Sequence, residues 1–296
     1  MRMGWIGLGA MGFPMVEAIL DQGWPVTVYD IVADRVQALE RQGAIGLQTL
    51  EHGFNEVEAL GVMVQNFTQC SDVLVGQGVL KQLRPGTLLC IFSTIGPAAM
   101  QTVQSWAEAV GVTVLDAPVS GGPGRARGHL SMMYSVSPGA HDRVQPIIEA
   151  LAETAFLVGD RPGQGQAVKM INQLLAGVHI AAAAEALTLA EKMGLDTALV
   201  TDVVSQSAGS SWMFQDRAPR MLQRYYQPPK SALAIFVKDL GIVQDTARTV
   251  GMPLFLASAA YQLFQGGASQ GRNGLDDASV AEVFRELAGL GGGPSN

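Results

Sequence analysis

The chain has 296 residues, of which 48% are hydrophobic and 15% are charged. This length and composition exclude a disordered chain and a single small binding module, and they favour two packed domains. Nineteen basic and 26 acidic residues leave a net charge of −7. The totals therefore indicate no basic surface for nucleic acid or for an anionic membrane, and we expect neither as a partner.

Short apolar segments, each bounded by Gly, Pro or Asp, recur through the first half of the chain and alternate with amphipathic stretches. We expect strands at residues 3–6, 26–29, 62–64, 88–91 and 113–115. Regular alternation of short strands with helices is typical of a parallel sheet covered by helices. The sequence therefore predicts an N-terminal α/β domain with a mostly parallel sheet over residues 1–162.

The pattern changes after Gly163, where apolar residues recur at the spacing of one helical face. These residues are Val168, Ile171, Leu174, Leu175 and Val178. The spacing predicts a long helix over residues 164–193, ended by Gly194 as a C-cap, that joins the first domain to the second. We expect an all-α C-terminal domain over residues 163–296, with a loose glycine-rich tail at 289–296.

Cysteine content and hydropathy point to a protein of the cytoplasm. Cys70 and Cys90 are too few and too isolated for a disulfide framework or a cysteine metal cage, which fits a reducing compartment. The apolar stretch 174–189 is interrupted by His179 and Glu185. We therefore expect no membrane span and no metal site.

Gly7, Gly9 and Gly12 form the pattern G-x-G-x-x-G between the strand that ends at Ile6 and an amphipathic segment at 15–20. In such a loop the first glycine makes the turn, the second lets the backbone approach a pyrophosphate, and the third lets helix pack on strand. An isolated pattern also occurs in turns that bind nothing, but this position favours a dinucleotide-binding, Rossmann-type domain. The predicted cofactor loop comprises Gly7, Leu8, Gly9, Ala10, Met11 and Gly12.

An acidic residue ends the second predicted strand and indicates which dinucleotide binds. Asp30 follows Gly12 by 18 residues, where a carboxylate accepts hydrogen bonds from the adenosine ribose and repels a 2′-phosphate. We therefore expect NAD in preference to NADP. Arg35, five residues further on, is interpreted as a solvated helix charge and not as a phosphate ligand.

Residues 116–122 follow another predicted strand and end in a hydroxyl group and two glycines. Ser120, Gly121 and Gly122 offer a side-chain donor and successive backbone N–H groups to a carboxylate. A small organic acid requires such donors. A plain loop without a ligand is the alternative interpretation of this segment taken alone.

Lys169, Asn172 and Gln173 share one face of the predicted long helix, because they stand three and four residues apart. A lysine near the start of a helix is usually a solvated charge. Burial beside a cationic nicotinamide would lower the pKa of such a lysine, so that Lys169 would exchange a proton near neutral pH. Lys238 and Asp239, in a second apolar helical segment, are interpreted by themselves as a surface ion pair.

Together these segments resemble the β-hydroxyacid dehydrogenases, the group that includes hydroxyisobutyrate dehydrogenase and tartronate semialdehyde reductase. The matching segments, in order, are residues 7–15, 116–122, 163–172 and 238–240. Within the family, residues 209–214 and 236–239 look most like the L-threonate dehydrogenases, which oxidise a four-carbon sugar acid.

The resemblance implies roles for particular residues. Lys169 would be the catalytic lysine. The substrate ligands would be Ser120, Gly121, Gly122, Asn172 and Gln173. Further cofactor-binding residues would be Gln65, Thr94 and Lys238. Homodimers or homotetramers are implied as well, and the apolar, alanine-rich helices of the second half agree with this.

Two departures from the family pattern affect the substrate more than the chemistry. Residues 123–130 form a loop that is one residue shorter and more basic than usual, and in it Arg125 or Arg127 is a candidate for a second acidic group. Gln173 stands where the family has a second asparagine after the lysine. Its extra methylene implies that whatever it anchors is reached differently.

The sequence therefore predicts an NAD-dependent oxidoreductase that transfers a hydride between nicotinamide and the hydroxyl-bearing carbon of a small hydroxy acid, either 3-hydroxyisobutyrate or a four-carbon acid such as L-threonate. Two alternatives remain. An imine reductase shares this architecture, but such enzymes typically lack the lysine. A non-catalytic NAD-binding protein would need neither Lys169 nor the loop 116–122. Phosphogluconate dehydrogenase chemistry is disfavoured, because the chain is too short for the enlarged helical domain of that family.

Overall fold

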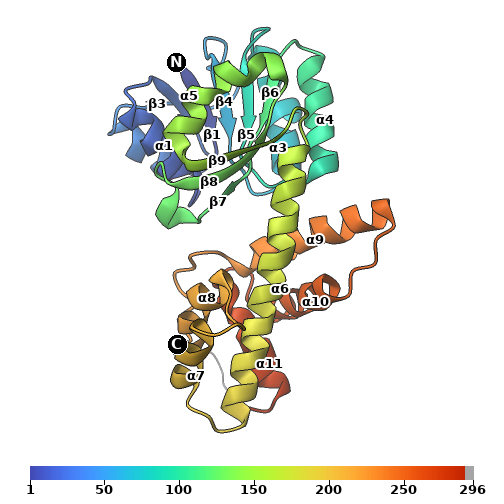
Figure 1. Ribbon diagram of the computed structural model, residues 1–296. Coiled ribbons are helices and arrows are strands. Elements are labelled where there is room, and N and C mark those ends of the chain that lie inside the picture. Colours follow the sequence, from blue (N-terminus) through green and yellow to red (C-terminus); the bar gives the residue numbers. More distant parts are fainter. Residues whose placement is uncertain (291–296) are drawn as a thin grey trace. The chain divides into compact units, whose positions relative to one another are not determined.

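The computed structural model describes residues 1–290 of the chain (Figure 1). Most of the predicted tail, residues 291–296, lies outside the described residues. The chain forms two compact units, here called unit 1 and unit 2, which divide between Lys169 and Met170. This division falls inside helix α6 (Gln164–Lys192), a few residues after the domain boundary expected from the sequence.

Unit 1 is built on a sheet in the order β3-β2-β1-β4-β5-β6-β8-β7, with β9 paired to β8. The strands are β1 Met3–Ile6, β2 Val26–Tyr29, β3 Ile45–Gly46, β4 Ala59–Val62, β5 Leu88–Ile91, β6 Thr113–Asp116, β7 Val119–Ser120, β8 Leu130–Ser135 and β9 Ala152–Gly159. Strands β1 to β6 are parallel, whereas β8 is antiparallel to β6 and β7. The first six strands follow the order of dinucleotide-binding folds, in which ligands bind beyond the carboxyl ends of the strands where the order reverses.

Helices cover both faces of this sheet (Figure 1). They are α1 Gly12–Asp21, α2 Ala33–Glu40 and α5 His141–Leu151 on one face, and α3 Phe67–Ser71 and α4 Pro97–Glu108 on the other. Strand β1 shows the two-sided burial, since Met3 and Trp5 join the first core and Ile6 joins the second. Continuous apolar strands follow from burial on both faces. The predicted Rossmann-type α/β domain is confirmed.

One predicted strand is misplaced. The expected strand at 62–64 overlaps β4 (Ala59–Val62) only at Val62. Strand β4 contains Gly61, a residue of low β propensity, so the apolar pattern did not indicate this segment. A Cβ atom on Gly61 would lie 2.4 Å from Cε3 of Trp5 on the neighbouring strand. The glycine therefore leaves room for the buried indole, and this packing overrides local propensity.

Unit 2 consists of helices in its described part, as predicted. After α6 they are α7 Thr197–Ser205, α8 Trp212–Gln223, α9 Leu233–Val250, α10 Leu256–Ser269 and α11 Ala281–Leu287. Phe236 of α9 and Phe264 of α10 stack in its core with ring centroids 5.2 Å apart. Helix α6 ends one residue before the prediction, and Gly194 adopts a φ of +72°, as expected of a glycine that follows a helix.

Helix α6 is the one helix in residues 1–290 that is long and apolar enough, by composition alone, to cross a membrane. The share of its most apolar window that is buried inside the structure is 56%. The core helix of a globular protein gives the same result, so this helix is weak evidence for a membrane span.

A buried ionic cluster ties α8 to the segment before α11, and the sequence patterns did not predict it. Arg217 donates two hydrogen bonds to the Asp277 carboxylate, over 2.9 and 2.7 Å, and Arg220 donates to Asp276 over 2.5 Å. All four side chains are less than a tenth exposed. Asp216 bonds both arginines: burial alone would raise its pKa, but the two guanidinium groups hold that pKa below its usual value. Charges this deep require such pairing.

We expect Asp277→Ala to lower the free energy of unfolding by about 3–5 kcal/mol, because it leaves the Arg217 guanidinium buried without its main partner. Denaturant unfolding followed by circular dichroism measures this. Asp245→Ala is the matched control, since it removes a carboxylate from an ion pair with Arg248 whose side chains are about three-quarters exposed. Equal unfolding midpoints for the two variants would contradict the assigned role of the buried pair.

Candidate functional site

The glycine-rich loop after β1 leaves open space where the sequence predicts a pyrophosphate. Gly7 has a φ of +95°, and a Cβ atom there would lie 2.2 Å from the carbonyl oxygen of Met63. A Cβ atom on Gly12 would lie 1.9 Å from the carbonyl oxygen of Gly7, whereas one on Gly9 would meet nothing within 4 Å. Helix α1 starts at Gly12 without a side-chain cap. The loop thus offers a helix N-terminus and an unobstructed approach to an anion.

Asp30 lies at the carboxyl end of β2, beside this loop. Its Oδ2 accepts a hydrogen bond from the Leu8 N–H over 2.6 Å, and its Oδ1 accepts one from the Val32 N–H over 2.8 Å. Arg35 is close to the same carboxylate, at 3.5 Å, although its side chain is 46% exposed. Arg35 is therefore not only a solvated charge, since it also pairs with Asp30. The carboxylate is fixed against the loop that would hold the cofactor.

The next two loops of the same edge contain Gln65, after β4, and Thr94, after β5. The Val64 N–H donates to Ser93 Oγ over 2.8 Å, which joins the two loops. Gln65 is exposed and Thr94 is half-buried. Because β1, β2, β4 and β5 are parallel and in register, their carboxyl ends meet at one edge of the sheet. The predicted cofactor residues of unit 1 lie along this edge.

The predicted carboxylate loop is partly a strand. Ser120 belongs to β7, which pairs with β8, and only Gly121 and Gly122 adopt the positive φ values of a turn, +133° and +69°. A Cβ atom on Gly122 would meet nothing within 4 Å. Ser120 is half-buried and Gly122 is exposed, so both remain accessible to a ligand.

The two arginines after this loop are engaged with carboxylates. Arg127 donates two hydrogen bonds to Asp21, over 2.8 and 2.9 Å, and this contact lowers the pKa of Asp21. Arg125 donates to Glu153 over 2.8 Å. Both side chains are about half exposed. These pairs make the arginines weaker candidates for a second acidic group of the substrate.

Lys169 is 6% exposed, which is inconsistent with an ordinary solvated charge. It lies near the start of α6, three residues after Gln166. The Gln166 carboxamide accepts hydrogen bonds from the Ile95 and Gly96 N–H groups, over 2.9 and 3.1 Å. The first turn of α6 is therefore attached to the loop after β5, at the same edge of the sheet as the glycine-rich loop.

Asn172 and Gln173 follow on α6, within unit 2, and belong to a hydrogen-bonded chain. Asn172 Nδ2 donates to Gln173 Oε1 over 2.9 Å, and Gln173 Nε2 donates to Asp239 Oδ2 over 2.5 Å. Lys238 Nζ lies 2.7 Å from Asp239 Oδ1. Asp239 is only 2% exposed, so the interpretation of Lys238 and Asp239 as a surface ion pair is wrong. The longer Gln173 side chain reaches a neighbouring helix, α9.

Several residues of this arrangement were not predicted as functional. Asp116, Gln166 and Ser93 are buried, and each bonds loops or turns that contain predicted site residues. Asp116 and Gln166 lie inside the segments 116–122 and 163–172, but their partners are distant in sequence, so the local pattern does not show what these side chains bond. Within residues 1–290 no group of three or more His, Cys, Asp or Glu side chains is placed to hold a metal ion.

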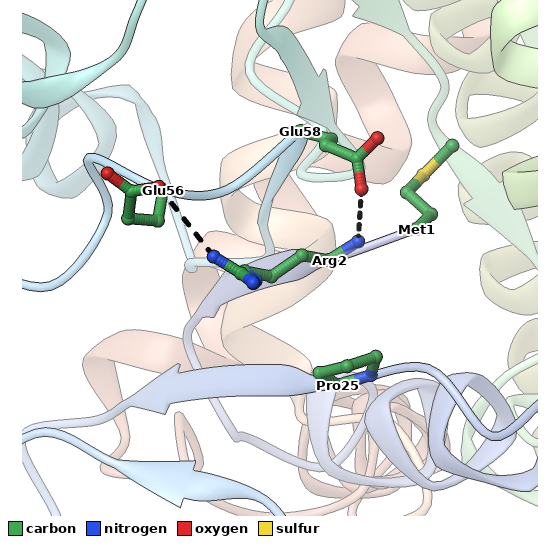
Figure 2. Close-up of a pocket in the computed structure, with 5 residues that line it drawn as sticks. All are labelled: Met1, Arg2, Pro25, Glu56 and Glu58. Atoms are coloured by element: carbon green, nitrogen blue, oxygen red, sulfur yellow. Dashed lines mark hydrogen bonds and ion pairs between the residues drawn. The ribbon is translucent and has the colours of Figure 1, made fainter.

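A surface pocket lies at the opposite edge of the sheet. Met1, Arg2, Pro25, Glu56 and Glu58 line it (Figure 2). The Arg2 backbone N–H donates to Glu58 over 2.6 Å, and the Arg2 guanidinium lies 3.7 Å from Glu56. These residues precede β1, β2 and β4, so the pocket is at the amino ends of the strands. It is separate from the glycine-rich edge.

Comparison with known proteins identifies relatives along almost the whole chain. Residues 2–159 match the family model described as the NAD binding domain of 6-phosphogluconate dehydrogenase, and residues 163–284 match the one described as the NAD-binding of NADP-dependent 3-hydroxyisobutyrate dehydrogenase. L-threonate dehydrogenase of Escherichia coli O6:H1 is 40% identical over 286 residues, which are 96% of this chain and 94% of that relative.

Solved structures of similar fold also cover almost the whole chain. A crystal structure of 3-hydroxyisobutyrate dehydrogenase from Salmonella typhimurium is similar with a TM-score of 0.88 and 38% identity, over 95% of this chain and 99% of that one. An imine reductase of Streptomyces aurantiacus is similar with a TM-score of 0.65 over 97% of this chain and 99% of its own, but at 23% identity this likeness shows the fold alone.

Two of the three glycines of the loop, Gly9 and Gly12, allow ligand binding and folding to be tested separately. We expect Gly9→Ala to fold with an unchanged unfolding midpoint but to weaken NAD binding by about tenfold or more, because the added methyl group enters the open space. Gly12→Ala should lower stability, because its Cβ overlaps the Gly7 carbonyl oxygen. Calorimetric titration and thermal melts measure the two effects.

Gly139→Ala is the control, since a Cβ atom there meets nothing within 4 Å and the residue lies in an exposed turn after β8. Unchanged NAD affinity in Gly9→Ala would show that the loop is not the pyrophosphate site.

Proposed function

The chain belongs to the 3-hydroxyisobutyrate dehydrogenase family, and on that premise we propose that it oxidises L-threonate with NAD as the hydride acceptor. The chain is an NAD(P)-dependent dehydrogenase that acts on the hydroxyl-bearing carbon of a hydroxy acid. The observation that carries the proposal is the burial of Lys169 on the turn of α6 that follows Gln166. A buried amine in this place is suited to exchange a proton with an alcohol.

The residues of the glycine-rich edge fit a dinucleotide. The open space at Gly9 and the uncapped start of α1 suit a pyrophosphate, and Asp30 stands where an adenosine ribose is recognised. We assign Gln65, Thr94 and Lys238 to the cofactor as well, by family resemblance. When bound, the nicotinamide supplies hydride acceptance.

This chain's residues hold the substrate and move its proton. In oxidation, neutral Lys169 accepts the hydroxyl proton at Nζ, and in reduction its ammonium group returns it. The Ser120 hydroxyl and the Gly121 and Gly122 N–H groups donate hydrogen bonds to the substrate carboxylate. Asn172, one turn after Lys169, orients the substrate hydroxyl group.

Gln173 is reassigned from substrate ligand to positioning residue. Both ends of its carboxamide are occupied, one by Asn172 and the other by Asp239, and the side chain is 8% exposed. A buried carboxamide with these bonds holds Asn172 in one orientation. The extra methylene relative to the usual asparagine spans the distance to α9.

The substrate is assigned as L-threonate because the 40%-identical relative is an L-threonate dehydrogenase, and residues 209–214 and 236–239 resemble that group. The structure that is 38% identical is named a 3-hydroxyisobutyrate dehydrogenase, so 3-hydroxyisobutyrate is the second candidate. NAD is preferred to NADP because the Asp30 carboxylate, fixed by Leu8 and Val32, would repel a 2′-phosphate.

A substrate panel tests these assignments. L-threonate, 3-hydroxyisobutyrate, glycerate, serine and hydroxybutyrates are each offered with NAD and with NADP, and the reduced nicotinamide is followed by absorbance. We expect the highest kcat/KM with L-threonate and NAD, by about tenfold or more over the other acids. A preference for NADP would refute the role of Asp30, and turnover of imines without turnover of any hydroxy acid would refute the function.

Lys169 has its own test. We expect Lys169→Ala and Lys169→Arg to lower kcat by about 10²–10⁴-fold, because alanine carries no base and an arginine does not deprotonate. NAD affinity should stay within a few-fold of wild type. Lys192→Ala, at the far end of the same helix, is the control and should keep full activity. Near-normal turnover in Lys169→Ala would remove the assigned proton carrier.

A further inference from the structure

We propose that Asp116 is a positioning residue whose buried carboxylate fixes the first turn of α6 and thereby sets the place of Lys169. The proposal rests on the proposed role of Lys169 as proton carrier. It adds to that role a means by which the lysine is held against the nucleotide-binding edge, and every residue that it uses lies within unit 1.

The Asp116 carboxylate is fully buried and accepts four hydrogen bonds. Its Oδ2 accepts from the Gly163 N–H over 2.7 Å, from the Gln166 N–H over 3.2 Å and from Ser135 Oγ over 3.0 Å. Its Oδ1 accepts from Gln166 Nε2 over 3.0 Å. Two of the donors are backbone groups at the start of α6, where a helix attracts negative charge. The carboxylate therefore caps α6 from the end of β6.

The helix approaches the strand closely enough for this cap because residue 165 is a glycine. A Cβ atom on Gly165 would lie 2.8 Å from the Met133 carbonyl oxygen and 2.9 Å from that of Asp116. The Gly165 N–H also donates to Ser135 Oγ over 3.2 Å. The neighbouring strands β6 and β8 thus both contact the first turn of α6.

Gln166 connects the capped turn to the cofactor side of unit 1. Its Nε2 donates to Asp116 and to the Ser93 carbonyl oxygen, each over 3.0 Å, and its Oε1 accepts from the Ile95 and Gly96 N–H groups. The side chain is fully buried and all four of its hydrogen-bonding positions are used. A carboxamide bonded in this way has one stable orientation.

Ser93 extends the network to the loop after β4, because its Oγ accepts the hydrogen bond from the Val64 N–H. Three predicted site residues lie next to members of this network or within one helical turn of them. Gln65 follows Val64, Thr94 lies between Ser93 and Ile95, and Lys169 is three residues after Gln166. The network therefore holds the backbone next to the predicted cofactor residues, Gln65 and Thr94, in a fixed position relative to the backbone next to Lys169.

A buried charge is costly, so its retention requires a compensating gain. Burial raises the pKa of the Asp116 carboxyl group, and the four donors that face it oppose this shift. All four groups donate hydrogen bonds to the carboxylate. Two of them are backbone N–H groups, which cannot act as hydrogen-bond acceptors. Replacing the carboxylate with a carboxamide would place an N–H₂ group against N–H donors and loosen the turn.

A double-mutant cycle tests the proposal. We expect Asp116→Asn to lower kcat by about 10–100-fold, as a displacement of about 1 Å does. The KM for L-threonate and the dissociation constant for NAD should stay within about threefold. In a Lys169→Ala background the same substitution should have little further effect, because its action is exerted through the lysine. Asp142→Asn is the control, since Asp142 is an exposed acid in the first turn of another helix, α5.

The outcomes separate the proposal from the function on which it rests. If Lys169→Ala keeps its activity, the proposed function fails. If Lys169→Ala loses activity but Asp116→Asn keeps wild-type kcat, or has its full effect in the Lys169→Ala background, the positioning role is refuted. If Asp116→Asn does not fold, Ser135→Ala, which removes one of the four donors, replaces it. Its expected loss of kcat is about threefold, again suppressed without Lys169.

Discussion

The buried carboxylate of Asp116 stands between strand β6 and helix α6, and the candidate site depends on that junction. Strand β6 ends at the carboxylate, and the first turn of the 29-residue helix is bonded to it. An isolated carboxylate in this place would destabilise the fold by several kcal/mol. Four donors make it a structural anchor, so polar contacts fix the first turn of α6 within unit 1.

Glycines allow close approach of backbones at the same edge of the sheet where the Asp116 carboxylate fixes α6. Gly7 and Gly12 allow the first loop to turn tightly and α1 to pack on β1, while Gly9 leaves space for a ligand. Gly165 lets α6 approach the carboxyl end of β6. At each place the absence of a side chain determines how closely two backbones, or a backbone and a ligand, approach each other.

Local patterns in the sequence predicted what depends on neighbours along the chain. The strand before Gly7, the glycine-rich loop and the long helix after Gly163 each have a short-range signature of periodicity or turn residues. The fold class followed from these, as did the shared helical face of Lys169, Asn172 and Gln173.

Features that depend on distant partners were not predictable from one sequence. Strand β4 was misplaced because Gly61 accommodates Trp5 from another strand. The sequence around Asp239 predicts a surface residue, because nothing near it shows that Gln173, 66 residues away, donates to it. The cap at Asp116 joins residues 47 and 50 positions apart. Such polar contacts carry no periodicity, so only the folded chain shows them.

In the proposed mechanism, Lys169 exchanges the proton of the substrate hydroxyl group from a position fixed by the start of α6. A crystal structure of the protein with NAD and L-threonate tests this most directly. We expect Lys169 Nζ to lie within hydrogen-bond distance of the reacting hydroxyl oxygen, about 2.6–3.2 Å, with the Asp116 and Gln166 contacts intact. A complex in which another side chain holds that hydroxyl group, and the Lys169 amine faces solvent, would contradict it.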